Sequence, residues 1–238
     1  MKKKVCVVQH APHEGPGTFG GVLREYGFEI ETLFATQAGP QAWEQVSRSS
    51  LVLVMGGSMG VYEKDLHSFL RPELAALEKR IREKLPTLGV CLGAQLLAEA
   101  SGGRAYLSGR REVGWHEVQL TDAGLKDPVL GRLDWSKPVF HWHQDTYDLP
   151  GIGVGLANSE RFAQQAFRLG ENIYGLQFHP EVPQSEVREW VLSEPHLPYG
   201  SADGVQSVEE ILHGAARHSQ AMRELARELL ERFLILIS

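Results

Sequence analysis

One of the two cysteines of this chain, Cys91, lies in the stretch "GVCLG", where Gly89 and Gly93 flank it. This spacing is the cysteine form of the G-x-S-x-G elbow, in which a strand turns sharply into a helix and presents a nucleophile. Small neighbours allow the turn to close, and the helix N-terminus favours the thiolate. The pattern predicts a nucleophilic thiol. The alternative is a small buried residue, which is the commoner state of a free cysteine.

A cysteine nucleophile needs a base, and the base needs an orienting partner. The stretch "YGLQFHPEV" places His179 and Glu181 two residues apart, with Pro180 between them. In an extended chain this spacing puts both side chains on one face. His179 could accept the thiol proton while Glu181 holds its imidazole in the required tautomer. The alternative is a histidine at a strand end beside a solvated glutamate.

A third segment could stabilise negative charge. In "VLVMGGSMGVYE" an apolar run ends at Gly56 and Gly57. Backbone N–H groups left free at such a turn can serve as oxyanion donors in acyl transfer. The amide of Gly57 and the amide of Leu92, the residue after the nucleophile, form the natural pair. An ordinary glycine turn after a strand is the alternative.

The stretch "HWHQD" places His141 and His143 on one strand face, with Asp145 close by. Such a set could begin a metal site, but no third and fourth ligand stand out. The same segment fits substrate binding or strand packing, so we expect neither a metal nor a cofactor. The other cysteine, Cys6, is flanked by valines in an apolar run, and we expect it to be buried and inert. We interpret Glu14, Glu63 and Asp65 as solvated loop charges.

The elements that must position these residues alternate along the chain. Apolar runs predict strands, helical spacing and glycine stops predict helices, and the alternation predicts a doubly wound, mostly parallel α/β sheet with helices on both faces. The expected strands are 4–9, 28–34, 50–55 and 86–90, with several short ones between 115 and 178; the expected helices are 19–26, 71–85, 93–101 and 185–193, with one or two more over 207–238. We expect one domain over 1–238, with a catalytic core over 1–183 and a C-terminal helical extension over 184–238.

Bulk composition narrows the function classes. The 238 residues are 42% hydrophobic and 23% charged, with a net charge of -6. This is typical of a globular protein, and an acidic chain without a long Lys/Arg run disfavours nucleic-acid binding. No apolar run reaches membrane-spanning length, and two cysteines do not form a disulfide framework. We therefore predict a cytoplasmic protein that binds a small molecule and neither nucleic acid nor membrane.

Three blocks occur in a fixed order: "MGGSMG", "LGVCLGAQLLAEASGG" and "YGLQFHPEV". Together they resemble the signature blocks of class I (triad) glutamine amidotransferases, over about residues 5–182. The resemblance is closest to stand-alone proteins similar to the glutaminase domain of GMP synthetase, and "EVGWHEVQL", "FHWHQDTYDLP" and "GGSMGVYE" fit that subgroup.

The resemblance implies that Cys91 attacks the side-chain amide of glutamine, that a γ-glutamyl thioester forms as ammonia leaves, and that water then releases glutamate. His179 and Glu181 would complete the triad, and Gly57 and Leu92 would supply the oxyanion amides. The resemblance further implies substrate contacts from Gly56, Gln95, Trp142 and His143.

The chain also departs from GMP synthetase, which continues into an ATP-pyrophosphatase domain and a dimerisation domain. We therefore expect no GMP synthesis by this chain alone. In addition, "EKDLHSFLRPE" stands where the subgroup has a Trp-containing loop. Three hypotheses stay open: a glutaminase that supplies ammonia to a partner synthetase or an unknown acceptor, a free-standing γ-glutamyl peptidase, and a catalytically silent regulatory or binding module.

Overall fold

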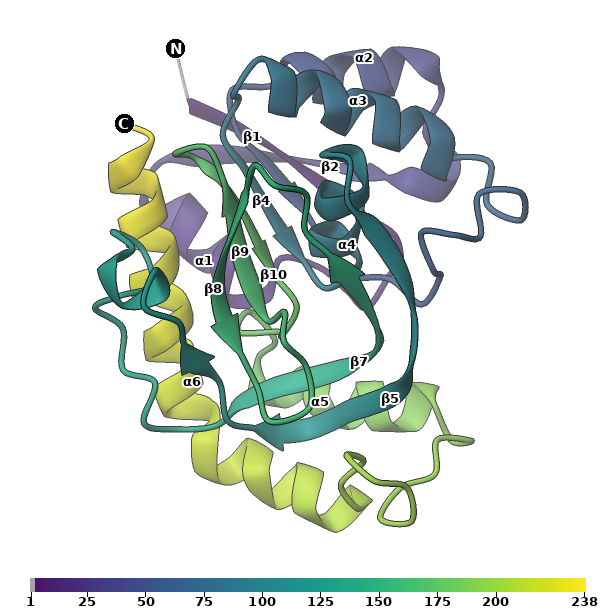
Figure 1. The fold of residues 1–238 in the computed structure, drawn as a ribbon, viewed down its shortest axis with the longest axis vertical. Coiled ribbons are helices and arrows are strands. Elements are labelled where there is room, and N and C mark those ends of the chain that lie inside the picture. Colours follow the sequence, from purple (N-terminus) through teal and green to yellow (C-terminus); the bar gives the residue numbers. More distant parts are fainter. Residues whose placement is uncertain (1–2) are drawn as a thin grey trace.

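The computed structural model describes residues 3–238, and its centre is an eight-stranded sheet (Figure 1). The strand order is β2-β1-β3-β4-β10-β9-β8-β6, in which the first five strands are parallel and the last three are antiparallel to their neighbours. In that order the bounds are Phe28–Phe34, Lys3–Gln9, Val52–Val54, Thr87–Val90, Ile173–Leu176, Ala166–Leu169, Gly153–Asn158 and Gln119–Leu120. The predicted doubly wound, mostly parallel architecture is confirmed.

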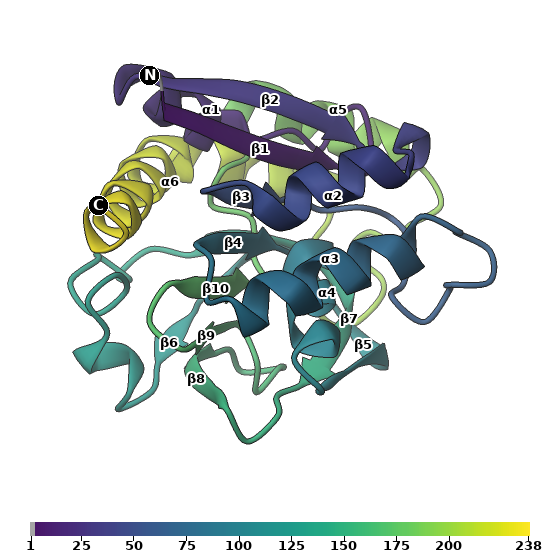
Figure 2. The same cartoon turned by 90° about the horizontal axis from the view of Figure 1, so that it is seen from above.

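Helices cover both faces of this sheet, as the view from above shows (Figure 2). Helices α2, α3 and α4 lie on one face, and α1 and α6 lie on the other. Their bounds are Pro40–Arg48, Leu70–Arg82, Leu92–Ala100, Gly17–Glu25 and Val208–Leu236. Side chains along β1 point alternately to the two faces of the sheet. Val5 and Val7 pack in the core beneath α1 and α6, while Cys6 and Val8 pack in the core beneath α2–α4.

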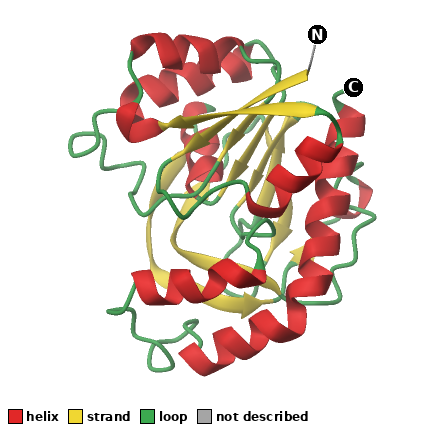
Figure 3. Ribbon diagram, turned by 180° about the vertical axis from the view of Figure 1, so that it is seen from behind, coloured by secondary structure: helices red, strands yellow, loops and turns green. Residues whose placement is uncertain are grey.

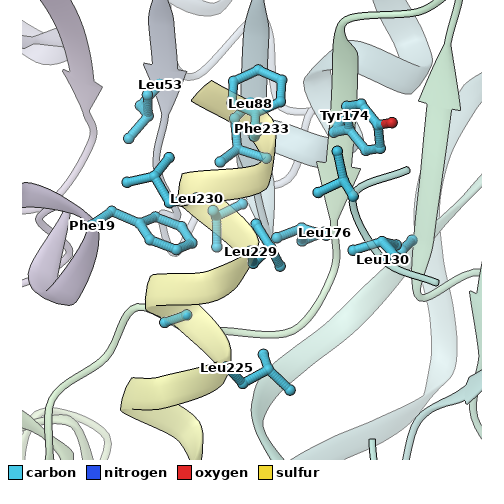
Figure 4. Close-up of a cluster of buried hydrophobic side chains, with 14 of the residues drawn as sticks. Phe19, Leu53, Leu88, Leu130, Tyr174, Leu176, Leu225, Leu229, Leu230 and Phe233 are labelled. Atoms are coloured by element: carbon cyan, nitrogen blue, oxygen red, sulfur yellow. The ribbon is translucent and has the colours of Figure 1, made fainter. Parts of the chain in front are cut away.

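The last helix is one continuous element of 29 residues rather than two. Ser207 begins it with a capping box, in which its side chain accepts from the Glu210 amide while Glu210 accepts from the Ser207 amide. Its apolar stripe packs on the sheet (Figure 4), where Leu225, Leu229, Leu230 and Phe233 approach Leu53, Leu88, Leu176 and Tyr174. The end of the last helix therefore covers the core, with Phe233 and Leu234 buried, although Ile235 is exposed.

A separate antiparallel pair, β5 (Arg104–His116) and β7 (Val139–Asp148), crosses the carboxyl end of the sheet. Helix α5 (Gln184–Ser193) packs against this pair and α6, and together they enclose a third apolar cluster (Figure 3). This layer covers the sheet edge at which parallel strands end. In open α/β sheets that edge is where ligands bind.

None of the helices formed by residues 3–238 is both long enough and apolar enough to cross a membrane.

Candidate active site

Cys91 lies at the turn between β4 and α4, and its backbone has φ 51° and ψ -107°. Positive φ is uncommon for a residue with a side chain and marks strain that the surrounding structure must hold in place. The flanking glycines are required by space rather than by dihedral angle. A Cβ on Gly93 would overlap the Val54 carbonyl, and one on Gly89 would overlap the backbone of Gly93. The predicted elbow is thus present, with the strand before it and the helix after it.

Cys91 is 6% exposed and lines a cavity. Its Sγ is 3.9 Å from the carbonyl oxygen of Trp142, to which the thiol can donate. Cys91 is also the N-cap residue of α4, so its sulfur lies at a helix N-terminus, where the helix dipole favours a negative charge. The second cysteine, Cys6, is buried as expected, and burial raises its pKa to about 11.

His179 and Glu181 follow β10 and are both buried. Nδ1 of His179 lies 2.9 Å from Oε1 of Glu181, which fixes the ring orientation. Within the described chain, Nε2 of His179 has no hydrogen-bond partner, so it is free to exchange a proton with a substrate or with the thiol. Burial opposes the charged imidazole, but Glu181 and Cys91 outweigh it and raise the pKa of His179 well above its usual range. The folded environment therefore favours the imidazolium form of His179.

The two residues predicted to supply oxyanion donors are neighbours in space. Gly57 lines the cavity, and a Cβ on Gly57 would come within 2.7 Å of the Leu92 side chain. Among residues 3–238, neither amide N–H donates to a protein acceptor. Unpaired donors beside a nucleophile can stabilise an oxyanion without any reorganisation during the reaction.

A buried pair behind this turn was not indicated by the sequence analysis. His10 follows β1, and its Nδ1 lies 3.0 Å from the Gly56 carbonyl oxygen. Its Nε2 lies 3.1 Å from both carboxylate oxygens of Glu73 on α3. Burial lowers the pKa of His10, but Glu73 and the Gly56 carbonyl together raise it above its usual value. A charged His10 can donate to both partners, which sets the orientation of the Gly56–Gly57 peptide.

The cavity above Cys91 has a volume of about 490 Å³. Gln95 and Trp142, two of the predicted substrate contacts, both line it. Gln95 lies one turn beyond the nucleophile and donates from Nε2 to Oε1 of Gln177 at 3.2 Å. Trp142 packs edge-on against Trp190 of α5 at 5.9 Å between ring centroids. Gly56 does not line the cavity, although a Cβ there would come within 3.1 Å of the His179 ring.

His143, the remaining predicted contact, borders the cavity but directs both ring nitrogens at protein groups. Nδ1 lies 3.1 Å from the Asp145 carbonyl, and Nε2 lies 3.3 Å from Oε2 of Glu112. His141 meets the same carboxylate oxygen at 3.3 Å. The structure thus supplies a third donor beside the two histidines, Glu112 of β5, which the sequence analysis did not single out.

Glu14 is not the solvated loop charge that the sequence suggested. Its side chain is 11% exposed, it lines the cavity with Cys91, and a Cβ on Gly56 would overlap its carboxylate. Burial raises the pKa of Glu14, against the opposing effect of nearby histidines. Its contact with Gly56 is made only in the folded chain, so no local sequence signal indicates it. Glu63 also borders the cavity, through the loop after Gly60, whereas Asp65 does not.

Comparisons with known proteins point to one family. The family model described as "Glutamine amidotransferase class-I" matches residues 21–194. The glutamine amidotransferase-like protein YfeJ of Salmonella typhimurium is 26% identical over 226 residues, with 93% of each chain covered. GMP synthase (glutamine-hydrolyzing) of Flavobacterium psychrophilum is 32% identical over 163 residues, which are 67% of this chain but only 27% of that protein.

Two solved structures share the whole fold. A glutamine amidotransferase from Thermotoga maritima is 29% identical with a TM-score of 0.82, covering 98% of this chain and 99% of its own. One from Methylobacillus flagellatus is 29% identical with a TM-score of 0.86, covering 100% of this chain and 96% of its own.

Proposed function

This chain belongs to the class I glutamine amidotransferase family, and we propose that it hydrolyses a γ-glutamyl amide through a thioester on Cys91. The observation that carries the proposal is a thiol at a helix N-terminus that opens onto a cavity, with the buried His179–Glu181 pair interacting with that thiol. Such a set is suited to acyl transfer by a nucleophile, a base and an orienting group.

In the first step the Cys91 thiolate attacks the δ-carbon of the glutamine side chain, and the C=O electron pair moves onto oxygen. The amides of Gly57 and Leu92 are the proposed donors to that oxyanion. The tetrahedral intermediate then collapses, the C–N bond breaks, and the His179 imidazolium gives its proton to the departing nitrogen. The products of this step are ammonia and a γ-glutamyl thioester.

In the second step neutral His179 takes a proton from water, and the resulting hydroxide attacks the thioester carbonyl. Collapse of the second tetrahedral intermediate breaks the C–S bond, which regenerates the thiolate and releases glutamate. Glu181 holds the same ring orientation in both steps, since its carboxylate faces Nδ1 and leaves Nε2 toward the reacting atoms.

The cavity also suggests how the amino-acid end of the substrate is held. Its lining includes the carboxylates of Glu63 and Asp145 and the guanidinium of Arg111, on the side formed by β5, β7 and the loop after Gly60. A free α-amino group would find its counter-charge in the two carboxylates, and the α-carboxylate would find its counter-charge in Arg111.

A second candidate, hydrolysis of a γ-glutamyl peptide, is favoured by the extent of the same cavity. The lining continues past Trp190 to the 193–198 segment after α5, so a group larger than ammonia has room beyond the scissile bond. Assays of ammonia and glutamate release, with glutamine and with a panel of γ-glutamyl dipeptides, distinguish the two substrates. Loss of both reactions in Cys91→Ala is expected. Turnover that persists in Cys91→Ala, or absent turnover together with no modification of Cys91 by a glutamine-like electrophile, would contradict the proposal.

A partner synthetase as ammonia acceptor is part of the proposal with glutamine as substrate. The similarity to GMP synthase, of which this chain spans about a quarter, supports a partner synthetase. A product formed only when both the chain and a synthetase are present would identify that acceptor.

A further inference from the structure

Three metal-ligating side chains lie together beneath the active-site cavity. Glu112 on β5 and His143 on β7 are direct cross-strand partners, and His141 lies two residues before His143 on the same face. Their exposed fractions are 1%, 6% and 0%. One donor atom from each lies within 4.8 Å of the others. Two histidines and a carboxylate form a donor set that suits zinc and its neighbours in the transition series.

The distances fit a shared metal better than direct hydrogen bonds. Oε2 of Glu112 is 3.3 Å from Nδ1 of His141 and 3.3 Å from Nε2 of His143. A charge-assisted N–H···O bond is shorter, about 2.7–2.9 Å. A tetrahedral site with metal–ligand bonds of about 2.0–2.1 Å has ligand atoms about 3.3–3.4 Å apart. Both distances match that separation.

The hydrogen-bond partners of the histidine ring nitrogens also favour a bound metal. Nδ1 of His143 faces the Asp145 carbonyl at 3.1 Å, so it must carry the proton. A ring that donates from Nδ1 can offer its Nε2 lone pair to a cation held between Nε2 and the Glu112 carboxylate. A histidine that donates its other N–H to a backbone carbonyl is the usual arrangement of a metal ligand. Both nitrogens of His141 are buried and have no hydrogen-bond partner within residues 3–238.

Neighbouring groups orient the carboxylate. Ser159 donates to Oε1 of Glu112 at 2.7 Å, and Nε2 of Gln165 donates to Oε2 at 2.6 Å. Oε1 of Gln165 is buried without a partner in the part of the chain that the structure describes. Glu112 also lines a surface pocket of about 620 Å³ with His116 and Arg161.

We propose that Glu112, His141 and His143 bind one divalent metal ion of the Zn²⁺ class. Its role is structural, because the three ligands are buried and the reacting thiol has its own base in His179. The ion ties β5 to β7 directly behind Trp142, whose carbonyl meets the Cys91 thiol. The competing arrangement is a proton in place of the metal, with His143 as an imidazolium paired to Glu112.

Titration with Co²⁺, followed by its visible absorption, tests the proposal. The full chain carries Cys91→Ala so that the active-site thiol cannot bind the ion, and Cys6 is buried. We expect one Co²⁺ per chain with the intense absorption of tetrahedral coordination, displaced by Zn²⁺. Glu112→Gln and His141→Gln should each weaken Co²⁺ binding at least about 100-fold. Even the loss of a group that only hydrogen-bonds to a metal ligand lowers metal affinity about 10–100-fold. The matched control is His116→Gln, which removes a histidine whose ring lies 5.6 Å from that of His141 but outside the donor set.

A second readout does not depend on the variants folding. Zn²⁺ at about 100 times its Kd should raise the Tm of the Cys91→Ala protein by about 5–10 °C, and a chelator should reverse the rise. Fewer than about 0.1 equivalents of Co²⁺ bound together with no Zn²⁺-dependent rise in Tm would overturn the proposal in favour of the proton. Equal Co²⁺ affinity in His116→Gln, Glu112→Gln and His141→Gln would also overturn it.

Discussion

Nδ1 of His10 lies 3.0 Å from the carbonyl oxygen of Gly56 and donates to it. In a trans peptide the carbonyl and the next N–H point in opposite directions. The hydrogen bond to Gly56 therefore fixes the direction of the N–H of Gly57, a residue that lines the cavity. Glu73 holds the other ring nitrogen, so a helix on one face of the sheet sets the proposed oxyanion donor.

Two substitutions of His10 separate its two contacts. Asparagine places an amide N–H near the position of Nδ1 and can keep the hydrogen bond to Gly56. Glutamine places an amide N–H near the position of Nε2 and keeps only the hydrogen bond to Glu73. We expect His10→Gln to lower kcat about 10–100-fold, less than the 10²–10³ typical of deleting an oxyanion donor, and His10→Asn to lower it less. Steady-state kinetics and Tm on both variants check this. The same kcat in both, at similar Tm, would show that the Gly56 contact does not act on the reaction.

Glu181 should set the alkaline limit of activity. Burial lowers the pKa of His179, but Glu181 and Cys91 outweigh it and raise the pKa well above its usual range, so the imidazolium proton is lost only as the pH rises through that raised pKa. Glu181→Gln removes the negative charge beside Nδ1, so the alkaline limb of kcat/KM should move to lower pH, with kcat reduced by about 10²–10⁴. The pH dependence of kcat/KM measures the shift. An unchanged alkaline limb would assign that limb to another group.

The two cysteines should differ sharply in reactivity. Cys6 is buried with its pKa raised to about 11, whereas Cys91 opens onto the cavity at a helix N-terminus. An alkylating agent should modify Cys91 at neutral pH and leave Cys6 intact in the folded protein. Peptide mass spectrometry locates the adduct, and the denatured protein serves as the control in which both react. Faster modification of Cys6 than of Cys91 in the folded chain would contradict this difference.

The elbow should not tolerate even one added carbon. In Gly93→Ala the new Cβ would overlap the Val54 carbonyl, so the turn or β3 must shift, at a cost of roughly 3 kcal/mol or more in the free energy of unfolding. The matched control is Gly21→Ala in α1, where a Cβ meets nothing within 4 Å and should stabilise the helix by about 0.5–1 kcal/mol. Denaturant unfolding measures both. Equal stability of the two variants would mean that the elbow has room to relax.

The parts of the site that could be predicted from sequence are those carried by short contiguous patterns. The elbow at Cys91 and the pair His179–Glu181 each lie within a few residues, and a local backbone conformation determines their geometry. The continuous apolar runs likewise predicted the central parallel strands. Pattern and structure agree there because a buried strand needs both faces apolar.

The parts that could not be predicted depend on contacts between distant segments. His10 and Glu73 are 63 residues apart and meet only because β1 and α3 pack at the same edge of the sheet. Glu14 and Glu112 look like ordinary exposed charges until the fold encloses them. Strand β5 was missed for most of its length because "RAYLSGRREV" is largely polar and pairs mainly with β7, outside the central sheet. Helix α2 was also missed, since its nine residues carry only a short apolar stripe.

The central claim is that Cys91 forms a covalent γ-glutamyl intermediate. The most direct measurement is intact-protein mass spectrometry after mixing with glutamine or a γ-glutamyl dipeptide and quenching in acid. We predict a mass increase equal to one γ-glutamyl group, located on Cys91 by peptide mapping and absent in Cys91→Ala. Turnover of the same substrate with no adduct on Cys91, and with equal rates in Cys91→Ala, would contradict the account.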